Sequence, residues 1–160
     1  MKLRKKGLWS VPLYCALSSW ISFYLTVYIG AHFFVVKSVD ASGVIHAELD
    51  PTRAEILNIV LFLLVLVVGG LLFRRMTRTE LALSAAIASG IYLFIVVCQL
   101  RIPSFPLKLS VVLAYVQNWT GTLSSFLMKL GLDLNFSVIM ASFAPLLFVP
   151  FGRKETADES

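Results

Sequence analysis

Four long stretches without a charged residue constrain this sequence more than any other feature. They cover about residues 8–36, 56–73, 81–100 and 134–151. An α-helix rises 1.5 Å per residue, so the shortest stretch gives about 27 Å of helix, close to the roughly 30 Å hydrocarbon core of a bilayer. The chain is 58% hydrophobic and 14% charged, whereas soluble domains carry about 25% charged residues. The sequence therefore predicts an all-α integral membrane protein, a four-helix transmembrane bundle forming one domain over residues 1–160.

A fifth segment, residues 109–130, is uncharged until Lys129 but rich in serine, threonine, asparagine and glutamine. Its large apolar residues recur at spacings of four and three, which is typical of one face of an amphipathic helix. They are Val112, Val116, Trp119, Leu123, Phe126 and Leu130. We expect an additional amphipathic helix that lies in the interface on the outer side, with Trp119 at headgroup depth. The alternative is a fifth span that packs with its polar side inward.

The basic residues distinguish these two topologies. Cytoplasmic loops of membrane proteins carry an excess of lysine and arginine. With four spans and the N-terminus inside, the inner side holds Lys2, Arg4, Lys5, Lys6, Arg74, Arg75, Arg78, Arg153 and Lys154, and the outer side holds Lys37, Arg53, Arg101, Lys108 and Lys129. Five spans would even out this asymmetry. The sequence thus favours four spans in the plasma membrane, with both termini cytoplasmic, and we expect a bacterial protein without a nucleic-acid partner.

Three arginines stand between the second and third apolar stretches. Arg74, Arg75 and Arg78 are expected to fix this turn on the inner side and to contact anionic lipid headgroups. Thr77 and Glu80 form the T-x-x-E pattern of a capping box, in which each side chain bonds the backbone amide of the other residue. The third helix therefore begins within a few residues of the end of the second. The two helices are predicted to form an antiparallel hairpin.

The segment between the first two spans is polar. Gly43 is expected to form a turn, and Asp50 followed by proline is a helix-start signal. The apolar alternation in this segment is too short to predict a strand. His32, His46, Glu48 and Asp50 are weak candidates for a site on the outer face. They do not have the spacing of a zinc site, so we expect a solvated loop, no metal, no cofactor and no catalytic group.

Small residues at a spacing of four are typical of helix contact faces in lipid, because they let two backbones approach closely. The first, third and fourth predicted spans each have such a face. The faces consist of Ser18, Ser22, Thr26 and Gly30; of Ala82, Ala86 and Gly90; and of Ser137 and Ala141. We expect these three spans to form the tight core of the bundle. The second span, residues 56–73, is expected to be the most lipid-exposed.

These packing faces predict the effects of substitutions. Leucine in place of Gly30 or Gly90 is expected to disrupt the core, and leucine at Val65 in the second span is expected to change little. Pro145 is expected to kink the last span, because it removes a backbone hydrogen bond to Ala141.

Three functional hypotheses remain open from the sequence. The first is a non-enzymatic membrane bundle that self-associates or serves as an accessory subunit of a larger membrane complex. The second is a small oligomeric transporter or channel for a neutral or lipophilic solute. The third is a membrane enzyme acting at the outer face through its histidine and carboxylate groups. The first is favoured because the spans lack interior charged residues, which pumps and many intramembrane enzymes need.

Overall fold

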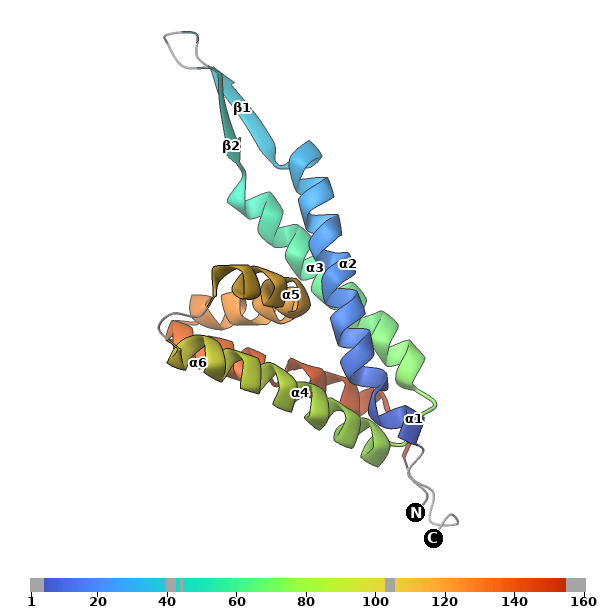
Figure 1. Ribbon diagram of the computed structural model, residues 1–160. Helices are drawn as coiled ribbons and strands as arrows, with labels where there is room; N and C mark the ends of the chain where they lie inside the picture. Colours follow the sequence, from blue (N-terminus) through green and yellow to red (C-terminus); the bar gives the residue numbers. More distant parts are fainter. Residues whose placement is uncertain (1–4, 40–42, 44, 103–105, 155–160) are drawn as a thin grey trace.

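The computed structural model (Figure 1) describes residues 5–39, 43, 45–102 and 106–154. Its elements, in chain order, are α1 Lys5–Leu8, α2 Ser10–Phe33, β1 Val35–Val39, β2 Ile45–Leu49, α3 Pro51–Phe73, α4 Arg78–Arg101, α5 Leu107–Lys129, α6 Leu134–Ala141 and the 3₁₀ helix η1 Ala144–Phe151. Four segments are long and apolar enough to cross a membrane, namely Ser10–Gly30, Pro51–Phe73, Arg78–Arg101 and Leu134–Phe151. The predicted all-α bundle with four membrane-spanning segments is confirmed, and the chain is a membrane protein.

The helices form two pairs that diverge from one end of the molecule. In Figure 1, α2 runs beside α3, and α4 runs beside α6 and η1. α5 lies in the angle between the pairs and packs against α2, α3 and α6. At the closed end, α1, the α3–α4 turn and residues 152–154 come together, and this end is called the terminal end. The opposite end of the α2–α3 pair carries the two strands and is called the hairpin end.

Backbone hydrogen bonds join the C-terminal residues to the α3–α4 turn. The Arg153 amide donates to the Met76 carbonyl (2.8 Å), and the Arg78 amide donates to the Arg153 carbonyl (3.0 Å). The Arg78 guanidinium also donates through Nε to the Gly152 carbonyl (3.2 Å). A side chain at Gly152 would meet the Arg78 backbone at 3.1 Å, so glycine allows this close approach. The two ends of the described chain therefore lie on the same side of the bundle.

Both predicted helix starts are present. The Glu80 amide donates to the Thr77 hydroxyl (3.2 Å), and the Thr77 amide donates to the Glu80 carboxylate (3.3 Å), which completes the capping box. Asp50 accepts hydrogen bonds from the Thr52 and Arg53 amides and caps α3. These local contacts explain why the apolar helices begin where they do, because each cap satisfies amides that have no partner within the helix.

A β-hairpin replaces the predicted loop and shortens the first span. The span was predicted to reach residue 36, but α2 ends at Phe33, and β1 pairs with β2 in an antiparallel register from Val35 opposite Leu49 to Val39 opposite Ile45. β-Branched residues favour such pairing, and the predicted turn residue Gly43 has a positive φ of 82°. The prediction that this segment forms no strand was wrong, because five residues suffice when a second strand lies opposite.

The last span is one segment with two helical forms. α6 ends at Ala141, and the chain continues from Ala144 as the 3₁₀ helix η1. The Ser142 hydroxyl donates to the Val138 carbonyl (3.1 Å), and Pro145 at the start of η1 cannot donate an amide to Ala141. An interruption was predicted at Pro145. The structure shows a change of helix type there in place of a single kinked α-helix.

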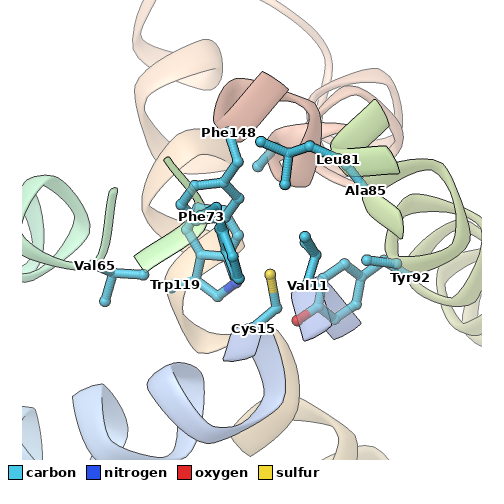
Figure 2. Close-up of a cluster of buried hydrophobic side chains, with 11 residues drawn as sticks. Val11, Cys15, Val65, Phe73, Leu81, Ala85, Tyr92, Trp119 and Phe148 are labelled. Atoms are coloured by element: carbon cyan, nitrogen blue, oxygen red, sulfur yellow. The ribbon is translucent and has the colours of Figure 1, made fainter. Parts of the chain in front are cut away.

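The core is centred on aromatic residues from four elements. Trp119 of α5 is 1% exposed and stacks on Phe62 of α3 with ring centroids 5.5 Å apart. Phe148 of η1 lies against Trp119, Phe73 and Tyr14 at centroid distances of 5.8, 5.5 and 5.7 Å. Figure 2 shows Trp119, Phe73 and Phe148 converging beside Cys15. The prediction of Trp119 at headgroup depth was therefore wrong: its ring fills the centre of the bundle.

Candidate functional site

A groove lies between the first turns of α3 and the last turns of α5, and we call it the α3–α5 groove. It has a volume of about 600 Å³, within the range typical of small-molecule sites. Its lining residues are Pro51, Ala54, Glu55, Asn58, Ile59, Asn118, Gly121, Thr122, Ser124, Ser125, Phe126 and Lys129. Most of the α5 residues among them belong to the polar side of the predicted amphipathic helix. That polar side therefore lines a recess.

Two local interactions hold the polar groups of the groove in place. The Thr26 hydroxyl of α2 bonds to Oδ1 of Asn58 (3.2 Å), and the Ser124 hydroxyl donates to the Gly121 carbonyl one turn earlier (2.8 Å). At the rim, the Lys129 ammonium forms an ion pair with the Glu55 carboxylate. The partner of Asn58 is a residue of α2 because α2 runs beside α3 at this level.

The inner limit of the groove is the aromatic core. Phe62 lies one helical turn beyond Asn58, and its stack with Trp119 fills the space between α3 and α5 at that level. Tyr14 donates to the Val65 carbonyl of α3 (2.7 Å) one turn further on. The groove therefore opens toward the hairpin end and is closed toward the terminal end.

The predicted contact faces of α2 and α6 lie inside the bundle. Ser18 and Ser22 are buried, Gly30 is buried and Thr26 is half-buried with the Asn58 bond described above. Ser137 and Ala141 of α6 are also buried. Gly30 differs from the others in what covers it, because the nearest atoms to a side chain built there belong to Phe34, directly after α2.

The predicted contact face of α4 does not lie inside the bundle. Ala86 and Gly90 are exposed, Ala82 is half-buried, and no atom lies within 4 Å of a side chain built at Gly90. The helix contacts of α4 are made by a different face, which carries Leu81, Ser84, Ala85, Ala88, Ser89, Tyr92 and Val96. The prediction that Ala82, Ala86 and Gly90 form a contact face within the chain was wrong. The face of α4 that does make the contacts lies only one or two residues away in the sequence.

The most tightly enclosed glycines of the described chain lie in α3, the helix that was predicted to be the most lipid-exposed. A side chain at Gly69 would overlap the Phe148 ring and reach Tyr14 at 2.7 Å, and one at Gly70 would meet Phe151 at 2.5 Å. Val65 is 5% exposed. The expectation that a larger residue at Val65 changes little is therefore corrected. The glycine pair in an aliphatic helix was the available signal for this contact.

The three arginines of the α3–α4 turn are exposed at the terminal end. Arg74 and Arg75 lie in the turn, and Arg78 lies in the first turn of α4 with its bond to Gly152. The chain brings Arg153 and Lys154 to the same end, next to this turn. The terminal end is thus strongly basic. That its arginines fix the topology and contact lipid headgroups stays a prediction.

The weak outer-face candidates are spread over the hairpin end. His32 is exposed and bonds through Nδ1 to the Tyr28 carbonyl (2.9 Å), and Asp50 is occupied by the α3 cap and by Arg53 at 3.1 Å. His46 and Glu48 belong to β2, opposite Ser38 and Val36, and their side chains lie outside the described part. Within the described residues, no three His, Cys, Asp or Glu side chains gather closely enough to hold a metal ion.

Comparison with known proteins finds no family model, no curated protein and no solved structure that matches this chain.

Proposed function

We propose that the protein is a non-enzymatic membrane bundle that works by associating with other membrane-spanning chains, in the first place with a second copy of itself. The support comes from the exposed face of α4. Ala86 and Gly90 are exposed on this face and, being small, leave a depression there between the larger exposed side chains of Leu83 and Phe94 when these lie on one side of the helix. Phe94 is 70% exposed.

This face has the shape that favours helix association in lipid. Spacings of three and four residues place Leu83, Ala86, Gly90 and Phe94 on one side of α4. Small residues let a second helix approach closely, and association then depends on packing of the adjoining large side chains. In a symmetric pair, Phe94 of each copy would cover the Ala86–Gly90 depression of the other. The corresponding small-residue faces of α2 and α6 are already covered within the chain, so α4 has the face that remains available.

The mass of the complex in lipid nanodiscs or mild detergent tests this proposal. The wild-type protein is expected to have at least twice the mass of the 17.8 kDa chain. Ala86→Leu fills the depression and is expected to shift the protein to the single-chain mass. Ala114→Leu is the matched control, because Ala114 is exposed on α5, and it should keep the wild-type mass. A wild-type protein of single-chain mass, or equal masses for both variants, would contradict the proposal.

A small oligomeric transporter is the second candidate, and the α3–α5 groove is the observation that favours it. The Phe62–Trp119 stack closes the groove within one chain, so a pathway would have to form between chains. For both candidates we propose the plasma membrane as location, with the basic terminal end in the cytoplasm and the hairpin end outside, because the excess of basic residues follows the positive-inside rule.

A further inference from the structure

We infer that the α3–α5 groove binds the uncharged, hydroxyl-bearing headgroup of a membrane lipid, such as the sugar head of a glycolipid. The inference is independent of self-association through α4, because the groove and the exposed α4 face share no residue. The charge of the groove, the donors and acceptors that line it, and its depth all support a headgroup as the ligand.

The groove carries no net charge, and it presents amide and hydroxyl groups within a larger area of apolar surface. The charged side chains in its lining, Glu55 and Lys129, are paired with each other at the rim. The remaining polar groups are amides and hydroxyls, from Asn118, Thr122 and Ser125 among others. A phosphate headgroup is bound best by unpaired arginine or lysine donors, whereas a sugar hydroxyl needs one acceptor and one donor close together. The amides and hydroxyls of the lining can donate and accept hydrogen bonds, as a sugar hydroxyl requires.

The donors and acceptors are held in position before any ligand arrives. Since Oδ1 of Asn58 is bonded to the Thr26 hydroxyl (3.2 Å), the amide nitrogen of Asn58 is left to donate. Since the Ser124 hydroxyl donates to Gly121 (2.8 Å), its oxygen is left to accept. Ser124 is 8% exposed and forms part of the buried floor. Such fixed groups reduce the entropy lost on binding.

The depth of the groove matches a lipid headgroup. Its α3 residues run from Pro51 to Ile59, about 13 Å of helix, and they cross from the capped, water-facing start of α3 into its apolar stretch. Ile59 and Phe126 are 42% and 56% exposed and form an apolar lip. A headgroup can lie among the amides and hydroxyls while its acyl chains continue over this lip into the bilayer.

A partner helix fits the groove less well than a headgroup. A helix with its side chains is about 10 Å wide, and a spanning helix needs a contact face along about 30 Å of depth. The groove ends after the first three turns of α3, at the Phe62–Trp119 stack. Its length therefore admits a compact headgroup and not a spanning helix.

Native mass spectrometry of the full chain released from nanodiscs tests the inference. The nanodiscs consist of phosphatidylcholine with small, equal amounts of a diglucosyl diacylglycerol and of phosphatidylglycerol, all with the same acyl chains. The wild-type protein is expected to retain the glucosyl lipid about tenfold more than either phospholipid, the effect of one or two neutral hydrogen bonds. Ser125→Leu, at an exposed groove position, is expected to abolish this preference.

Two further variants make the result specific to the groove. Thr122→Val keeps the shape of the side chain, removes one hydroxyl and is expected to lower the preference about fivefold. Ala114→Leu, outside the groove on the same helix, should leave it unchanged. Equal retention of the three lipids, preference for phosphatidylglycerol, or a preference that survives Ser125→Leu would overturn the inference. So would a co-purifying protein that shields the thiol of a Ser125→Cys variant when no lipid is bound.

Discussion

The effect of a single residue in this bundle depends on the space that its neighbours leave around it. Gly69 and Gly90 are both glycines inside apolar helices, yet one is enclosed by the Phe148 and Tyr14 rings and the other faces open space. The sequence does not distinguish them, because a spacing pattern identifies a helix face but not the helix that packs on it. Trp119 illustrates the same limit: its place on an amphipathic stripe was predictable, whereas its burial depends on Phe62 and Phe148.

An alanine at Gly69 is expected to destabilise the bundle by about 1–3 kcal/mol, because the added methyl group must displace the buried Phe148 ring and the half-buried Tyr14 ring. The free energy of unfolding in mixed detergent micelles measures this change. Gly121→Ala is the control, since Gly121 lies inside α5 and its added methyl group meets no atom within 4 Å. It should be neutral or slightly stabilising, because alanine favours a helix over glycine. Equal losses for the two variants would contradict the packing described for α3.

The starts of the helices were predicted correctly where they depend on residues that are close together in the sequence. Asp50 and the Thr77–Glu80 capping box start α3 and α4 as predicted, because a cap depends on residues within one turn. The hairpin β1–β2 was missed because each strand forms only when the other lies opposite. The groove was missed for a related reason: the polar side of α5 was visible in sequence, but its position against the start of α3 depends on how α5 lies between the helix pairs.

The capping box gives a prediction at the scale of one helix. Thr77→Ala is expected to destabilise the protein by about 1 kcal/mol, because the Glu80 amide loses its acceptor. Thr77→Ser keeps a hydroxyl at this position and should recover most of the loss. Thr79→Ala removes an exposed threonine two residues further on and should change little. Thermal unfolding of the detergent-purified protein compares the three variants, and a Thr79→Ala loss equal to that of Thr77→Ala would count against the cap.

The whole molecule has a different character at its two ends. At the terminal end, Arg78 and Arg153 join the C-terminal residues to the α3–α4 turn, and exposed basic side chains gather there. At the hairpin end, the helix pairs diverge, α5 lies between them, and the groove opens (Figure 1). The number of spans was predictable from composition and length. Their divergence was not, because it depends on the large side chains that α5 inserts between the pairs.

The central claim is that the chain crosses the bilayer four times, so that both ends lie on one side and the hairpin on the other. Labelling of intact cells with a membrane-impermeant maleimide tests it most directly, in a chain whose own cysteines, Cys15 and Cys98, are replaced by serine. Gly43→Cys, at an exposed position between β1 and β2, is expected to be labelled. Lys154→Cys and Lys6→Cys are expected to react only after the cells are opened. Labelling of position 154 together with position 43 in intact cells, or of position 154 without position 6, would contradict the account.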